Sequence, residues 1–188
     1  MPIVEGHSEA AAIPAFIRRI LHDAGAFDVE PDAKPIREKR QRLANPDVFA
    51  RRVRMARMKP GCIAVLALMD ADDDAACQLG PELVRAGRST ARVPVAVNLA
   101  VREIEAWLLA GIESLRGFRG VLADAERPHD VESIRGAKER LEQLKPNGYK
   151  PTIDVLPMLL RLDYQSARTR SRSLDRFVRL VTQLAQAE

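Results

Sequence analysis

Two short acidic segments contain the residues of this sequence that are best suited to chemistry. Glu5-Gly6-His7-Ser8-Glu9 lies near the start of the chain, and Asp70-Ala71-Asp72-Asp73-Asp74 follows the apolar run 62–69. In an extended Asp-x-Asp, both carboxylates point the same way because side chains alternate with period two. Carboxylates held a few ångströms apart repel one another, and a divalent cation removes that repulsion. Oxygen ligands of this kind favour Mg²⁺, Mn²⁺ or Ca²⁺ over zinc.

The elements around these segments predict an α/β fold. Strands are expected at 2–4, near 34–36, at 62–69 and at 93–97. Helices are expected from 8 to 24, with a kink at Pro14, from 46 to 59, from 74 to 85 and from 99 to 112. Strands that alternate with helices predict a mainly parallel, Rossmann-like sheet with helices on both faces. Ligands gather beyond the carboxyl ends of such strands, where Glu5, Asp70 and Asp72 would meet.

The chain is expected to divide into a core, residues 1–112, and a basic helical C-terminal extension, residues 113–188, within one globular unit. A charged helix is predicted at 131–144, and Trp107 is predicted to lie in the hydrophobic core. The 188 residues are 46% hydrophobic and carry a net charge of +4, which suits a single globular domain.

The composition also sets limits on location. Cys62 and Cys77 have neither zinc-site nor disulfide-framework spacing. We therefore expect two reduced thiols in a cytoplasmic protein without a signal peptide. No apolar run approaches the ~20 residues of a membrane helix, so no membrane partner is expected.

The sequence does not match several established motifs. A calcium hand starting at Asp70 would need Gly where Ala75 stands and Glu where Pro81 stands. Phosphate-binding loops, dinucleotide fingerprints and Gly-x-Ser-x-Gly elbows are not found in the sequence. A helix cap remains an alternative explanation for Asp72 to Asp74, because acidic residues often precede helices.

Six arginines are candidates for contact with the phosphates of a nucleic acid. They are Arg18, Arg19, Arg51, Arg168, Arg170 and Arg172. Such side chains give salt-dependent binding that does not depend on base sequence. The competing interpretation is a set of solvated helix faces with glutamate partners. His7 could orient water or a phosphate, although an exposed loop histidine is the simpler interpretation.

The order of these motifs resembles the Toprim (topoisomerase-primase) domain. Val4-Glu5-Gly6-His7-Ser8-Glu9 is followed by an apolar strand that ends in Asp70-Ala71-Asp72, and then by the segment Val101 to Leu109. The sequence looks like the small stand-alone proteins of the domain-of-unknown-function 4276 family. These resemble the nuclease domain of overcoming-lysogenization-defect proteins, which is fused to an ATPase.

The resemblance implies roles for six carboxylates. Glu5, Asp70 and Asp72 would be catalytic metal ligands, and Glu9 would help to hold a second cation. Glu105 and Glu103 would add carboxylates from the later helix, although both could equally be surface charges. The implied cofactor is Mg²⁺ or Mn²⁺. Tyr149 and Tyr164 lack a motif for covalent transfer, so hydrolysis is the simpler expectation.

The predicted function is a divalent-metal-dependent nuclease that acts on DNA or RNA, in phage defence beside a separate ATPase. One alternative is a non-catalytic binding or assembly partner with the same fold, and a homo-oligomer stays open. A phospho-acceptor domain of receiver type is a third interpretation, but no acceptor Asp with a distant Lys stands out.

Overall fold

The computed structural model describes residues 1–186, and within them a single parallel sheet forms the centre of the fold. Its strands are β1 (Pro2–Val4), β2 (Ile36–Arg37), β3 (Val65–Asp70) and β4 (Val95–Ala100). Their order is β2-β1-β3-β4, and all neighbours run parallel. The register pairs Val4 with Leu68 and Asp70 with Ala100. The predicted α/β, Rossmann-like fold is confirmed.

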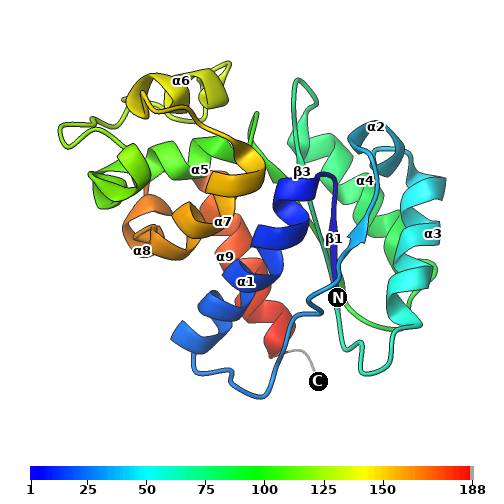
Figure 1. Ribbon diagram of the computed structural model, residues 1–188. Coiled ribbons are helices and arrows are strands. Elements are labelled where there is room, and N and C mark those ends of the chain that lie inside the picture. Colours follow the sequence, from blue (N-terminus) through cyan, green and yellow to red (C-terminus); the bar gives the residue numbers. More distant parts are fainter. Residues whose placement is uncertain (187–188) are drawn as a thin grey trace.

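Helices cover both faces of the sheet (Figure 1). On one face lie α1 (His7–Asp23) and α9 (Arg172–Ala185), and on the other lie α3 (Pro46–Arg57) and α4 (Ala76–Arg88). Alternate residues of β3 serve the two cores: Leu66 and Leu68 face α1 and α9, whereas Val65, Ala67 and Met69 face α3 and α4. The sheet is therefore buried on both sides, which explains its continuous apolar strands.

The helical C-terminal part shares the larger of these cores. Its helices and those that link the strands are α2 (Arg40–Leu43), α5 (Glu105–Ala110), α6 (Ala137–Leu144), α7 (Pro151–Arg161) and α8 (Tyr164–Ala167), with 3-10 turns at Ile112–Leu115 and Phe118–Gly120. Trp107 is fully buried, packs at a tilted angle against Phe177 of α9 with ring centroids 5.1 Å apart, and donates a hydrogen bond of 2.8 Å to Ser173 Oγ. The prediction of a core tryptophan is confirmed.

Some predicted element boundaries are wrong. Residues 99 and 100 belong to β4, and α5 covers only Glu105–Ala110 of the helix predicted at 99–112. The apolar run there suits a buried strand as well as a helix, so periodicity alone misplaced the boundary. α1 is one helix from His7 to Asp23 with Pro14 inside it, and α6 is shorter than predicted. No helix among the described residues is long and apolar enough to cross a membrane.

Candidate acidic site

Glu5 and Asp70 meet at the carboxyl edge of the sheet. Glu5 follows β1 directly, and Asp70 is the last residue of the neighbouring strand β3. The backbone N–H of Asp70 donates to Glu5 Oε2 across 3.4 Å. Two acidic segments that lie 65 residues apart in the sequence are thus brought together by the parallel pairing of their strands.

Glu9 approaches the same place from the first turn of α1. Its side chain is only 8% exposed, and its Oε2 accepts a hydrogen bond of 3.0 Å from Ser8 Oγ. A Cβ atom on Gly6 would clash with Glu9 Oε2. The backbone of Gly6 is extended (φ −110°, ψ 174°), so the glycine is needed here for space and not for an unusual conformation. Gly6 therefore leaves room for the carboxylate of Glu9 to fold back over the helix start.

The third side of the site is the start of α5. Asp70 Oδ1 accepts a hydrogen bond of 3.0 Å from the backbone N–H of Ile104, which joins the end of β3 to this helix. The next residue, Glu105, is 7% exposed, and its Oε1 accepts a hydrogen bond of 3.1 Å from the hydroxyl of Tyr149. Glu105 is thus held at the same edge of the sheet as Asp70.

The four acids act on one another electrostatically. Burial, followed by the charge of Glu9, raises the pKa of Glu5 to about 7. Burial, followed by the charges of Glu5, Glu105 and Glu9, raises the pKa of Asp70 well above its usual range. Burial also raises the pKa of Glu105, against the hydrogen bond from Tyr149. Mutual repulsion of this kind identifies Glu5, Glu9, Asp70 and Glu105, hereafter the acid cluster, as one group.

Against the larger effect of burial, the charge of Arg40 lowers the pKa of Glu5, but the carboxylates of the acid cluster lack a direct ion pair among the described residues. Within residues 1–186, none of its four carboxylates forms an ion pair with Arg, Lys or His. Two other buried acids of the chain do have such partners: Glu38 pairs with Arg52, and Asp154 pairs with Arg119 and Lys145. Because a buried charge normally needs a partner or a metal, the acid cluster lacks a positive charge.

The donor set of the acid cluster fits a hard divalent cation. All its ligand atoms are carboxylate oxygens, which suit Mg²⁺, Mn²⁺ or Ca²⁺. As the side chains stand, the described residues contain no group of three His, Cys, Asp or Glu side chains close enough to hold an ion. Binding of an ion would therefore require the carboxylates to move closer together.

Asp72 and Glu103 lie outside the acid cluster. The side chain of Asp72 is 66% exposed, its φ is +50°, and its Oδ2 lies 3.8 Å from Nε of Arg40. Its charge nevertheless contributes to the raised pKa of Glu5. Glu103 turns to the start of α6, where its Oε2 accepts from the backbone N–H of Lys138 at 3.0 Å. The prediction assumed that side chains alternate along an extended Asp-x-Asp. The left-handed backbone of Asp72, just after β3, breaks that alternation, so Asp70 and Asp72 do not point the same way.

The predicted nucleic-acid arginines do not form one surface. Arg19 donates from Nη1 to the carbonyls of Leu159, Leu160 and Leu162 at 3.0, 3.0 and 2.8 Å, so it caps the end of α7. Arg18 pairs with Glu30 at 2.7 Å. Arg18 follows Glu9 by nine residues in α1, which corresponds to roughly 14 Å along the helix axis. Arg18 is therefore remote from the acid cluster.

The later arginines gather around a second region. Arg168, Arg170 and Arg172 line one open hollow with Arg176 and Arg179 of α9. Arg168 pairs with Asp175 at 2.7 Å, and Arg170 pairs with Glu113 at 3.1 Å. Arg51 lies apart on α3, in a hollow with Arg52 and Arg54. His7 is exposed, and its ring Nε2 lies 2.6 Å from Nη1 of Arg37.

Sequence reasoning missed three residues at this edge of the sheet. Gly6 and Tyr149 act through Glu9 and Glu105, as described above. Arg40 donates from Nε to the carbonyl of Asp70 at 2.6 Å and from Nη2 to that of Ala71 at 3.3 Å. The Glu-Gly-x-x-Glu spacing offered a signal for Gly6, whereas the remote contacts of Arg40 and Tyr149 leave none in the sequence.

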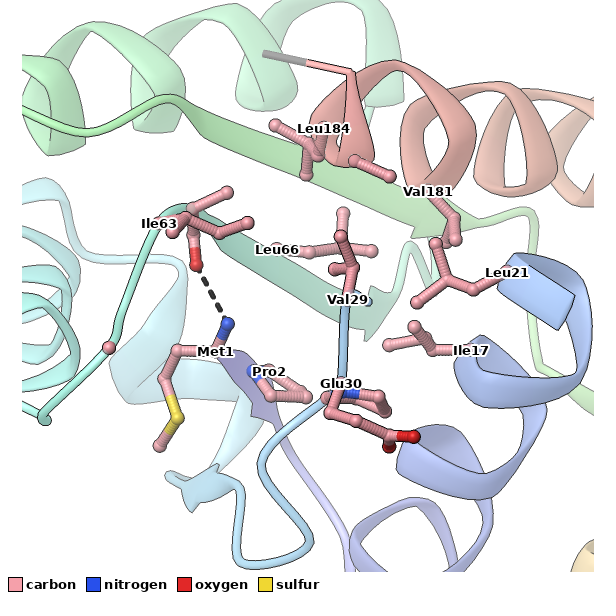
Figure 2. Close-up of a pocket in the computed structure, with 14 residues that line it drawn as sticks. Met1, Pro2, Ile17, Leu21, Val29, Glu30, Ile63, Leu66, Val181 and Leu184 are labelled. Carbon is pink, nitrogen blue, oxygen red and sulfur yellow. Dashed lines mark hydrogen bonds between the residues drawn. The ribbon is translucent and has the colours of Figure 1, made fainter. Parts of the chain in front are cut away.

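A pocket lined mainly by apolar side chains lies at the opposite edge of the sheet, as Figure 2 shows. Ile17, Leu66, Val181 and Leu184 line it, and the amino group of Met1 donates to the carbonyl of Ala64 at 2.7 Å. Glu30 is the acid in its lining. This pocket offers no set of metal ligands or nucleophiles, so the chemistry of the described chain concentrates at the carboxyl edge.

An α/β protein with an acid cluster at the carboxyl edge of a parallel sheet is the class that the fold and site define. The sequence matches the family described as a domain of unknown function (DUF4276) over residues 4–182. This match covers nearly the whole chain, so the protein belongs to that family. No curated protein and no solved structure gave a significant match.

Proposed function

We propose that this protein is a nuclease that hydrolyses phosphodiester bonds with Mg²⁺ or Mn²⁺ held by the acid cluster. The observation that carries the proposal is the set of buried carboxylates without a cationic partner: Glu9 and Glu105 are 8% and 7% exposed, yet no arginine or lysine of the described chain pairs with them. A bound cation would supply the missing charge.

The chain's residues have separate tasks in this proposal. Glu5 and Asp70 would hold a cation at the strand ends, with Glu9 and Glu105 completing the ligand set from α1 and α5. When bound, the metal would polarise a phosphoryl oxygen and lower the pKa of a water molecule. Arg40 fixes the turn after β3 through the carbonyls of Asp70 and Ala71, so it would keep Asp70 in place during the reaction. Asp72, which is exposed near this turn, would be recruited as a ligand only by rotation of its side chain.

Nucleic acid is the proposed substrate because the chain offers phosphate-binding side chains away from the acids. Arg172 and Arg176 are exposed on α9 and have no ion pair within residues 1–186. Their spacing of four residues puts both on one helix face. We propose that the hollow lined by Arg172 and Arg176 contacts the phosphate backbone. Arg18 and Arg19 are less suited to this role because both already form contacts within the chain.

The resemblance to the Toprim domain supports the same chemistry. That pattern has a Glu after the first strand and an Asp-x-Asp after a later one; Glu5 and Asp70 match it, whereas Asp72, the second Asp, lies outside the acid cluster. The further likeness to the nuclease domain of overcoming-lysogenization-defect proteins supports a role in phage defence beside a separate ATPase in the cytoplasm. The homo-oligomer that the sequence left open belongs to the same proposal.

Metal-dependent nicking of supercoiled plasmid tests the proposal. Wild-type protein with Mn²⁺ is expected to nick the plasmid, and Asp70→Asn and Glu5→Gln are expected to lower the rate at least 100-fold while the fold is kept. Glu82→Gln, an exposed acid on α4, is the matched control and should retain full activity. Equal nicking by wild type and Asp70→Asn would refute the proposed function.

A non-catalytic binding or assembly partner is the second candidate, and one set of contacts favours it. Asp70, Glu9 and Glu105 each accept a hydrogen bond within the chain, from Ile104, Ser8 and Tyr149. These contacts would give the acids a structural use without catalysis. Tight Mn²⁺ binding without nicking of any nucleic acid would select this candidate.

A further inference from the structure

Tyr149 connects the C-terminal part of the chain to the acid cluster. It lies in the loop between α6 and α7, is 4% exposed, and donates its hydroxyl to Glu105 Oε1 at 3.1 Å. Of the two oxygens of Glu105, Oε2 accepts no hydrogen bond from another residue within residues 1–186. The phenol therefore occupies one oxygen of this carboxylate and leaves the other available.

The loop that carries Tyr149 is held by a buried ion cluster. Lys145 Nζ lies 3.5 Å from Asp154 Oδ2 and donates to Asn147 Oδ1 at 3.0 Å. On the far side of Tyr149, the backbone N–H of Lys150 donates to Asp154 Oδ2 at 2.8 Å. Arg119 adds a second cation, at 3.0 Å from Asp154 Oδ1. Both ends of the short loop are thus fixed, so the phenol is presented to Glu105 from a rigid support.

We propose that Tyr149 is a positioning residue that makes Glu105 a one-oxygen ligand and so sets the preference of the site for Mg²⁺ or Mn²⁺ over Ca²⁺. This inference rests on the proposed function, because it assumes a cation in the acid cluster. Mg²⁺ requires near-octahedral geometry with single oxygens, whereas Ca²⁺ accepts six to eight ligands and often both oxygens of one carboxylate. A phenol on Oε1 disfavours two-oxygen coordination by Glu105, which removes an advantage of Ca²⁺.

The chain supplies a matched control for this inference. Tyr164 is its other tyrosine; it is also buried and also donates to a carboxylate, at 2.8 Å to Asp23 Oδ2, but that acid is outside the acid cluster. Tyr149→Phe and Tyr164→Phe each delete one hydroxyl and one hydrogen bond to a carboxylate. A general loss of packing or stability should therefore affect both variants alike.

Calorimetric titration of metal-free protein with Mn²⁺ and with Ca²⁺ tests the inference. Tyr149→Phe is expected to bind Mn²⁺ at least ~10-fold more weakly, the usual effect of removing a group that orients a ligand, and to bind Ca²⁺ as well as or better than wild type. Tyr164→Phe should keep the wild-type ratio of the two affinities. An unchanged ratio in Tyr149→Phe, or an equal loss for both ions, would overturn the inference while the proposed function stands. Wild-type protein that binds neither ion would refute both.

A second measurement keeps the test decisive if Tyr149→Phe does not fold. Wild-type protein labelled with 3-fluorotyrosine should give two ¹⁹F resonances, one from each tyrosine. The Tyr164→Phe variant assigns the resonance that remains to Tyr149. Saturating Mg²⁺ is expected to shift the Tyr149 resonance and to leave that of Tyr164 in place. A Tyr149 resonance that does not move while Mg²⁺ binds would contradict the inference.

Discussion

Two buried acidic regions of this protein differ in where their positive charge comes from. In the acid cluster, Glu105 and its neighbours have no cationic partner in the described chain, and the pKa values of Glu5, Asp70 and Glu105 are raised. Asp154, which is 2% exposed, is surrounded by Arg119, Lys145 and the N–H of Lys150. Burial alone would raise the pKa of Asp154, but these donors outweigh burial and lower it.

The two regions are neighbours, and Tyr149 lies between them. After burial, the charges of Glu105 and Asp154 are both among the causes that raise the pKa of its phenol. The fold supplies Lys145 and Arg119 as partners for Asp154, but it supplies no equivalent partner for the acid cluster among the described residues. The absence of such partners at the acid cluster, within residues 1–186, is the observation on which the proposed cation from solution rests.

The largest expected effect comes from breaking the paired region. Lys145→Met should lower the free energy of unfolding by about 3 kcal/mol, because it leaves Asp154 with only part of its compensation. For a chain of this size the melting temperature should fall by about 6–12 °C. Thermal unfolding followed by circular dichroism measures this, and Lys59→Met, at an exposed position, is the control. A fall of under 2 °C would mean that the ion cluster does not support the loop.

The space beside Gly6 offers an intermediate effect at the acid cluster. Gly6→Ala keeps an allowed backbone but pushes the flexible carboxylate of Glu9 away. We expect Mn²⁺ affinity to fall by roughly 10-fold, about 1.4 kcal/mol, with little change in the melting temperature of metal-free protein. Calorimetric titration provides the affinity. Gly25→Ala would be a poor control because φ is +77° there, so Ala24→Ser, outside the site, serves instead. Unchanged affinity in Gly6→Ala would remove Glu9 from the ligand set.

The smallest effect separates the regions by pH. The pKa of Glu5 in the folded protein is about 7, above its ordinary value of 4.5, so ionisation of Glu5 opposes folding above pH 7 and has no effect below pH 4.5. Glu5→Gln should therefore stabilise metal-free protein at pH 8 by roughly 1 kcal/mol, after discounting for solvent screening, and leave it unchanged at pH 4.5.

The paired region should show the opposite sign. Asp154 has a lowered pKa, so its contribution is present above its unfolded pKa and is lost as the pH falls through its folded pKa. Asp154→Asn should then destabilise most at pH 8 and least in acid. Thermal unfolding at the two pH values checks both variants, and the same sign for Glu5→Gln and Asp154→Asn would break the comparison.

The meeting of Glu5 and Asp70 could be predicted from sequence because it depends on local signals. Glu5 directly follows an apolar strand, Asp70 is the last residue of another, and adjacent parallel strands end at one edge of their sheet. The same reasoning failed for Asp72, since a left-handed residue just past the strand turns its side chain away. It failed for Arg19 because the carbonyls that Arg19 caps lie 140 residues or more along the chain.

The contribution of the C-terminal part could not be predicted. Tyr149 is 44 residues from Glu105, and no periodic pattern marks the loop that carries it. Its position depends on Lys145 and Asp154 finding each other in the folded core, which is a property of packing and not of spacing. The family match over residues 4–182 includes both parts of the chain.

The central claim is that the carboxylates of Glu5 and Asp70 share a divalent cation. Diffraction from crystals soaked in Mn²⁺, measured at the manganese absorption edge, tests it most directly. The account predicts an anomalous peak about 2.0–2.3 Å from an oxygen of each of these two carboxylates. A fully soaked crystal with no peak between them, or with manganese bound only elsewhere, would contradict it.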